Sequence, residues 1–458
     1  MSDTSNDERT EPQDILQAVL DAIAGGHERE LFALLHSLHP SEIAHILESL
    51  PKRERLRLWK RTAPTKKGEV LLETHSEVRG QLIRAAKPRE LLRAVRQLQP
   101  DELADIFDQL PPKTVAALLS DMDSRRRERF ETLQKYPSDT AGGLMDVDAV
   151  AVREDVSLKV VLRYLRNVRR REKTLPELID MVIVVDEQDH YLGMLALSDV
   201  ISLDPELKVS EVMRRDIEAI DAMEPANKVA RLFEDRDLVS AAVVDDQNKL
   251  IGRITVDDIV DVIREEGERS ILSSAGLDID IDIFGPLLTS ARQRIIWLTV
   301  NLLNCFIAAY VIRHFDASIE QMVALAVLMP VVASMGGVAG IQTLTLVTRG
   351  LALEQIGPSN IGRLLLRELG IGLVNAAALA LTVVTIAGLW FQDWPLAGIF
   401  ALALLINLIN GAAAGSLIPL ALSRLGIDPA VAGGVVLTAA TDVIGFAAFL
   451  GLATWWLL

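Results

Sequence analysis

Residues 429–458 read PAVAGGVVLTAATDVIGFAAFLGLATWWLL, an apolar run whose only charged side chain is Asp442. A helix needs about 20 apolar residues to cross a bilayer, so this run predicts a membrane span. At ~1.5 Å per residue, Asp442 would lie roughly 20 Å along that helix, near mid-membrane. A charge there costs about 2.5–3.5 kcal/mol to insert. We therefore expect Asp442 to be an ion or proton ligand in a pore, or else a protonated or hydrogen-bonded residue that packs helices.

Four more apolar stretches precede this run, at about 295–312, 322–347, 364–389 and 396–422. Each is long enough to span, which predicts five membrane helices. If the N-terminus is cytoplasmic, the only arginine or lysine in the outer loops is Arg313. Six arginines then flank the inner ends of the spans: Arg292, Arg294, Arg349, Arg363, Arg367 and Arg424. The positive-inside rule therefore predicts a cytoplasmic N-terminus and an outside C-terminus.

The second stretch contains Pro330, Gly336, Gly337 and Gly340, which weaken a helix in mid-membrane. Freed backbone carbonyls are tolerated only where protein or a water-filled cavity covers them, and they are hard ligands for a hydrated divalent cation. The alternative is close helix crossing through small residues, which is also the preferred interpretation of the small residues at 411–415 in the fourth stretch.

Charge is unevenly distributed along the 458 residues, whose formal net charge is −16. From Arg292 onward the chain is neutral, so the preceding part carries the whole excess of acidic groups. Such a surface argues against nucleic-acid binding and suits cations or simple solvation. The single cysteine, Cys305, excludes a disulfide framework and a cysteine metal cluster. The polar, acidic N-terminus is not a signal peptide, so we expect the soluble part to stay in the cytoplasm.

The segment before residue 137 has a helical pattern. We expect residues 1–13 to be a disordered tail and residues 14–136 to be an all-α domain. LHSLHPSEIAHILESLP (35–51) resembles VRQLQPDELADIFDQLP (95–111), and both indicate a capped amphipathic helix that ends before a proline. Repeated helical hairpins stack into a superhelix, although a plain helical bundle is the alternative.

Residues 137–265 follow a different rhythm. MVIVVD (181–186) and LGMLALSDV (192–200) recur as SAAVVD (240–245) and IGRITVDDI (251–259). This tandem α+β repeat resembles a pair of CBS domains, which often sense adenine nucleotides or metal ions, so ATP is a candidate ligand. We find no phosphate loop, dinucleotide fingerprint, HExxH or GxSxG motif, and we predict that the protein is not an enzyme.

An acidic helix follows the second repeat. Asp257, Asp261 and Glu265 are spaced at i, i+4 and share one face. An oxygen-rich face of this kind can take up Mg²⁺ or Ca²⁺, but it is also typical of an ordinary solvated helix. We expect residues 266–291 to form a connecting, plug-like helix and residues 292–458 to form the membrane domain.

The order of these parts resembles the MgtE family of magnesium channels and transporters. The most specific stretches are PVVASMGGVAGIQTLTLVTRGLA (330–352), TVDDIVDVI (255–263) and LGIDPAVAGGVVLTAATDVIGF (425–446). The resemblance implies a multidomain membrane protein with a superhelical N-domain, tandem CBS domains and five membrane helices. It also implies a homodimer in the bacterial inner membrane, with a pore at the dimer axis between the second and fifth spans.

The resemblance further assigns residues. It places a hydrated Mg²⁺ at Asp442, and it implies pore-lining positions at Pro330, Gly336, Gly337, Val338, Gly340, Gln342 and Thr438. It implies that cytosolic Mg²⁺ bridges acidic surfaces and closes the pore, through the ligands Asp101, Asp237, Asp257, Asp258, Asp261 and Glu266. Crowded carboxylates repel until divalent ions join them, so cation concentration can bias two arrangements.

Two departures from the family pattern concern selectivity and gating. Many members have Gly-Asn-x-Gly where this chain has Gly337-Val338-Ala339-Gly340, which leaves selectivity against other divalent ions open. Arg269 and Ser270 stand where further acids are expected, which leaves the strength of gating open.

Three hypotheses therefore stand. The first is a dimeric Mg²⁺-selective channel gated by Mg²⁺. The second is a broader carrier for Co²⁺, Mn²⁺ or Ni²⁺, which the hard oxygen ligands disfavour because these metals prefer nitrogen or sulfur. The third is a membrane-anchored nucleotide receptor, which predicts that Asp442→Ala leaves function intact.

Overall fold

A computed structural model describes residues 12–172, 178–277, 282–353 and 355–457. The chain divides into two compact units. The first unit comprises Met1–Gly267 and Asp280–Gly285, and the second comprises Glu268–Ile279 and Pro286–Leu458. The predicted tail at residues 1–13 lies almost entirely outside the described residues.

The first unit begins with an all-helical domain, as the sequence predicts. Its core buries Leu47, Leu58, Trp59 and Phe130 almost completely. Its helices are α1 (Pro12–Gly25), α2 (Glu28–Ser37), α3 (Pro40–Glu48), α4 (Lys52–Arg61), α5 (Lys67–Leu72), α6 (Ser76–Ala85), α7 (Pro88–Val95), α8 (Pro100–Phe107), α9 (Pro112–Asp121) and α10 (Ser124–Leu133).

The repeated sequence motif forms the same helix start twice. In α3 the backbone N–H of His39 donates to Glu42 Oε2 at 2.7 Å, and in α8 the N–H of Gln99 donates to Glu102 Oε2 at 2.6 Å. Each glutamate satisfies an amide that the helix itself leaves without a partner. The capped starts expected at the Pro-Ser-Glu and Pro-Asp-Glu sequences are therefore present.

Two three-stranded sheets follow, one in each CBS repeat. In both, the first strand pairs parallel with the second and the second pairs antiparallel with the third. The register shifts at Val184/Val185 and again at the equivalent Val243/Val244. The elements are α11 (Ala141–Leu144), β1 (Ala151–Arg153), α12 (Leu158–Glu172), β2 (Met181–Val185), β3 (Tyr191–Ala196), α13 (Leu197–Ser202), α14 (Val209–Val212), β4 (Ile220–Asp221), α15 (Ala226–Arg236), β5 (Ser240–Val244) and β6 (Leu250–Thr255).

The acidic helix differs from the predicted boundaries. Helix α16 spans Val256–Ser274 and starts directly at the end of β6. It stops at a turn in which Gly276 adopts φ +68°, a conformation that favours glycine. Among the described residues the next helix begins at Leu287, so the turn at Gly276 prevents residues 266–291 from forming one continuous helix.

A buried ion pair holds the segment before the first span against the helical domain. Asp282 accepts from Arg55 Nη1 at 2.6 Å and Nη2 at 2.8 Å, and from Gln81 Nε2 at 3.1 Å. The backbone N–H of Asp282 donates to Glu77 Oε2 at 3.1 Å. The side chains of Arg55 and Asp282 are 0% and 1% exposed, so Asp282 is anchored to α4 and α6.

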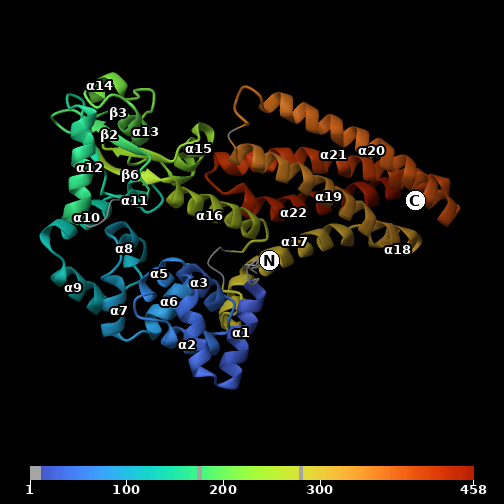
Figure 1. The fold of residues 1–458 in the computed structure, drawn as a ribbon. Helices are drawn as coiled ribbons and strands as arrows, with labels where there is room; N and C mark the ends of the chain where they lie inside the picture. The colour runs from blue at the N-terminus through green and yellow to red at the C-terminus, as the bar shows by residue number, and fades with distance from the viewer. Residues whose placement is uncertain (1–11, 173–177, 278–281, 354, 458) are drawn as a thin grey trace, which may run out of the picture. The chain divides into compact units, whose positions relative to one another are not determined.

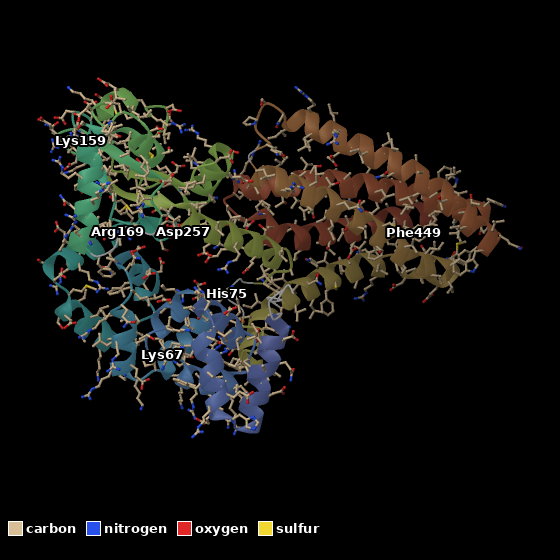
Figure 2. The ribbon with its side chains drawn as sticks, in the orientation of Figure 1. Lys67, His75, Lys159, Arg169, Asp257 and Phe449 are labelled. Carbon is tan, nitrogen blue, oxygen red and sulfur yellow. The ribbon has the colours of Figure 1, made fainter. Side chains whose placement is uncertain are left out.

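The second unit contains five helices that are long and apolar enough to span a membrane, counted among the described residues. They are α17 (Leu287–Arg313), α19 (Ala324–Ala352), α20 (Ile361–Phe391), α21 (Trp394–Arg424) and α22 (Pro429–Trp456), with the short α18 (Asp316–Gln321) after the first. Helix α21 packs against α19, α20 and α22, and α17 packs against α22 (Figure 1). Phe449, labelled in Figure 2, packs against Phe400 with the two rings tilted by 55° and their centroids 5.6 Å apart.

The second span is not broken, contrary to one interpretation of its sequence. Helix α19 continues from Ala324 to Ala352 with Pro330 inside it. Gly336 and Gly340 are buried against α21 and α22, where added side-chain carbons would stand 2.2 Å from Asn407 and 2.8 Å from Leu437. Side-chain carbons added at Gly411 and Gly415 would likewise stand 2.5 Å from the carbonyl oxygens of Gly336 and Gly340. These glycines allow close helix crossing, as the alternative interpretation proposed.

Candidate ion pathway and acidic sensor face

Asp442 lies in the middle of α22 and is half-buried. Within the part of the chain that the structure describes, it makes no hydrogen bond or ion pair. Thr438 and Gly434 precede it at four-residue spacing, so the three positions share one helix face. The hydrogen-bonded form of the packing interpretation would need a protein partner for Asp442, and none is found among the described groups, whereas a protonated packing residue would need none. A half-exposed carboxylate without a partner is suited to face a cation.

Span α19 passes beside this carboxylate. A side-chain carbon added at Gly337 would lie 3.8 Å from Thr441 Oγ1, next to Asp442 in sequence. The Thr441 hydroxyl itself donates back to the Leu437 and Thr438 carbonyls, each at 3.1 Å. The structure thus brings Gly337 close to the residue that neighbours Asp442.

The remaining predicted pore positions occupy different faces of α19. Gly336 and Gly340 are buried within the protomer, whereas Pro330, Val338 and Gln342 are exposed, Val338 by 50%. Because a helix presents residues four apart on one face, Pro330, Val338 and Gln342 fall along one exposed side of the span. Of the predicted pore positions on α19, only this exposed side and the half-exposed Gly337 are accessible from outside a single protomer.

A pair of hydrogen-bonded amides in the fourth span, one of them buried, was missed by the sequence analysis. Asn407 is 0% exposed and donates to the Val332 carbonyl at 2.8 Å, while its Oδ1 accepts from Asn410 at 3.3 Å. Asn410 also donates to the Ala440 carbonyl at 3.4 Å. These bonds tie α21 to α19 and α22 beside Gly336. The signal was present, because two amides three residues apart are unusual in an apolar span.

Gln342 lines a small cavity of 190 Å³ together with groups from α20. Glu368, only 5% exposed, and Asn375 line the same cavity, and Glu368 Oε1 has no hydrogen-bond partner. Arg367 Nη1 stands 3.8 Å from that oxygen. The sequence analysis did not single out Glu368, although it is a second acid within a span.

The second site is an acidic face shared by α8 and α16 in the first unit. Burial, together with the charges of Asp146, Glu102 and Asp258, raises the pKa of Asp101 to about 8. Burial and then the Asp257 charge raise the pKa of Asp258 to about 7. Asp101 Oδ1 has no hydrogen-bond partner. At neutral pH this face therefore holds protons that a cation could replace.

The structure brings some of the predicted sensor residues together and leaves others apart. Asp258 interacts electrostatically with Asp101 and with Asp257, while Asp261 is paired with Arg264 at 3.4 Å. Asp237 is exposed at the end of α15 in a left-handed conformation. Glu266 is exposed on α16, and Asp257 on the same helix is labelled in Figure 2.

Asp105 and Asp146 are additions that the sequence analysis missed. Asp105 lies four residues after Asp101 on α8, and its carboxyl feels the Glu265 and Asp261 charges of α16. Among the described residues, no three acidic, histidine or cysteine side chains lie close enough to hold a metal ion.

Comparison with protein families covers most of the chain, and the longest unmatched stretches are the residues before 38 and residues 266–328. Residues 329–452 match a divalent cation transporter family, residues 38–139 match the MgtE intracellular N domain, and residues 141–206 and 209–265 match CBS domains. The magnesium transporter MgtE of Thermus thermophilus is 32% identical over 337 residues, which are 72% of this chain and 73% of that protein. This chain belongs to the MgtE family.

Other MgtE relatives extend the match. The magnesium transporter MgtE of Bacillus subtilis is 27% identical over 441 residues, covering 96% of this chain and 97% of that protein. A crystal structure of the cytosolic domain of the Mg²⁺ channel MgtE in complex with ATP is 31% identical, with a TM-score of 0.48, and covers 54% of this chain and 99% of that one. The MgtE chain is thus a multi-pass membrane protein with a helical N-domain and a CBS pair, and its relatives are transporters rather than enzymes.

Proposed function

We propose that this MgtE chain is a Mg²⁺-selective channel that admits Mg²⁺ down its electrochemical gradient. The observation that carries the proposal is the half-buried Asp442 carboxylate, which no described protein group engages in mid-span. A membrane potential that is negative inside adds about 2.3 kcal/mol per elementary charge per 100 mV. Gly337, Val338 and Thr438 are the nearest candidates for the rest of the path, with Pro330, Gly336, Gly340 and Gln342 proposed from family resemblance.

The proposal includes a homodimer in the bacterial inner membrane, with the N-terminus in the cytoplasm and the C-terminus outside. One protomer offers a single carboxylate near Gly337, and two copies around a common axis would offer two. The exposed side of α19, which includes Val338, would then face the partner or the pore rather than lipid. The inner arginine excess supports this orientation.

Closure by intracellular Mg²⁺ is proposed to act through the acidic face. Asp101 and Asp258 already share space with other acids, and their raised pKa values of about 8 and 7 report the cost of placing charges there. A divalent ion relieves that cost, so cation binding would stabilise the arrangement in which α8 and α16 meet. Asp237, Asp257, Asp261 and Glu266 are proposed as further ligands, and ATP is proposed for the CBS pair.

Mg²⁺ uptake in cells that lack other Mg²⁺ transport tests the proposal. We expect Asp442→Asn, which keeps the side-chain shape, to reduce uptake to the background of untransformed cells at matched membrane expression. Asp316→Asn is the control, because Asp316 is an exposed carboxylate at the start of α18 and should leave uptake unchanged. Unchanged uptake in Asp442→Asn would refute the ion-path assignment and favour the receptor hypothesis.

Competition measurements separate the two transport hypotheses. A Mg²⁺-selective path should be little affected by equimolar Co²⁺, Mn²⁺ or Ni²⁺, since the candidate ligands are hard oxygens. Equal competition by these ions would support the broader divalent carrier.

A further inference from the structure

An open cavity of about 630 Å³ lies between helices α19 and α20 where their chain connection turns. Three arginines line it: Arg349 from the last turn of α19 and Arg363 and Arg367 from the first turns of α20. Arg363 and Arg367 are four residues apart and share one helix face. Positive groups from two different helices therefore converge on one space.

The connection that shapes this cavity is held by its own hydrogen bonds. Asn360 Oδ1 accepts from the Gly357 N–H at 2.9 Å, and its Nδ2 donates to the Gln355 carbonyl at 2.7 Å. The Gln355 N–H donates to the Gly350 carbonyl at 2.9 Å. A side-chain carbon at Gly350 would stand 2.7 Å from Ile356, so the floor of the cavity is closely packed.

The positive charge of this cavity is incompletely balanced. Arg367 lies 3.8 Å from Glu368, but Arg349 and Arg363 form no ion pair within the described ranges. From Arg349 to Glu368 the sequence contains one other acid, Glu354, which lies outside the described residues, so this stretch holds three basic and two acidic side chains. Two exposed guanidinium groups thus remain for an anion, and arginine binds phosphate oxygens in a bidentate manner.

The residues around the cavity and its place at the membrane interface favour a phospholipid as the source of the phosphate. Both helices are membrane spans, and the cavity lies where their arginines mark the water interface. Leu346 and Leu364 line it beside the arginines, and Leu346 is 48% exposed. An apolar wall next to basic groups suits a molecule with both a phosphate and an acyl chain. Basic pockets between spans are typical sites for anionic lipid head groups.

We propose that the cavity between α19 and α20 binds the phosphate head group of an anionic phospholipid through Arg349 and Arg363, with an acyl chain along Leu346. The site is separate from Asp442 and from the acidic face, and it does not depend on which ion the protein carries. A bound lipid would join the ends of the second and third spans.

Native mass spectrometry of the full-length protein tests this site. The protein is purified and exposed to equal amounts of phosphatidylglycerol and phosphatidylcholine, and bound lipids are counted. Each basic residue near an anionic surface contributes about 1 kcal/mol, so Arg349→Gln/Arg363→Gln should bind phosphatidylglycerol about 30-fold more weakly. Arg424→Gln is the matched control, because Arg424 ends α21 at the same kind of boundary but does not line the cavity.

Each outcome decides the proposal. Selective loss of phosphatidylglycerol in the cavity variant, with the control unchanged, supports it. Equal loss in both variants means diffuse surface attraction and overturns it, as does no loss in either. Displacement of the lipid by an equal concentration of glycerol 3-phosphate would show that soluble phosphates occupy the site instead. If the double variant does not fold, Arg363→Gln alone should still bind several-fold more weakly. Mg²⁺ uptake is measured separately, so failure of the lipid site leaves the ion-path result intact.

Discussion

The Arg55–Asp282 pair provides the sharpest structural prediction. Asp282→Asn removes one charge and one acceptor while keeping the side-chain volume. Asp282 now accepts two bonds from Arg55, one from Gln81 and one from the Phe284 N–H at 3.0 Å, all in a site with almost no solvent exposure. Removing one partner of a buried pair costs about 3–5 kcal/mol, because the other charge stays buried without compensation. Since Asn retains one acceptor, we expect about 3 kcal/mol.

That free energy implies that the segment at 282–285 leaves the helical domain about 150-fold more often. Hydrogen–deuterium exchange on the full-length protein should therefore show faster exchange in peptides covering 282–286 and α4. Glu28→Gln is the control, because the Arg61–Glu28 pair is exposed and such pairs contribute little. Unchanged exchange in Asp282→Asn would refute the reasoning that this pair anchors the segment. Arg55→Met/Asp282→Leu should recover protection, because an apolar pair leaves no buried charge.

Further predictions concern protons and glycines. Burial is the main reason that the pKa of Asp101 is raised to about 8. The arrangement in which α8 and α16 meet therefore binds more protons than the separated helices do. Without Mg²⁺ its stability should fall as the pH rises from about 4 to about 8. Exchange in α8, corrected for intrinsic rates, should rise between pH 6.5 and 8.5, and Asp101→Asn should flatten this dependence; a flat wild-type profile would contradict it. Gly336→Ala should destabilise the membrane domain by about 1–3 kcal/mol through contact with Asn407, whereas Gly434→Ala, with open space around it, should not. Thermal melting in detergent measures both, and equal melting temperatures would show that α19 can move away from α21.

Much of the architecture followed from the sequence because its signals are local. Apolar runs mark the spans, and a repeat of strand patterns marks the CBS pair. The role of Gly336 and Gly340 did not follow, since a glycine that loosens a helix and one that admits a neighbour look the same in sequence. Only the position of Asn407 across the crossing distinguishes them.

Long-range pairs were also beyond the sequence. Arg55 and Asp282 are 227 residues apart, and nothing near either residue marks it as a partner of the other. Asp101 was assigned through family resemblance, but its contact with the charges of Asp146 and Asp258 depends on how the helical domain meets the CBS pair. Asp105 was within reach of sequence reasoning, since it lies one helical turn from Asp101 on the same face.

The helical domain makes two sets of charged contacts, at the acidic face and at the Arg55–Asp282 pair, and their stabilities depend differently on pH and divalent ions. The acidic face involving Asp101 and Asp258 is weakened by its own charge, so protons or divalent ions should strengthen it near neutral pH. At Asp282 burial raises the pKa, but hydrogen bonds from Arg55 and Gln81 outweigh this and keep the pKa below its ordinary value of 3.8. The stability that this pair contributes is therefore complete above about pH 4 and is lost only in stronger acid. We expect the segment at 282–285, two residues before α17 begins at Leu287, to stay with the helical domain whenever cations change the acidic face.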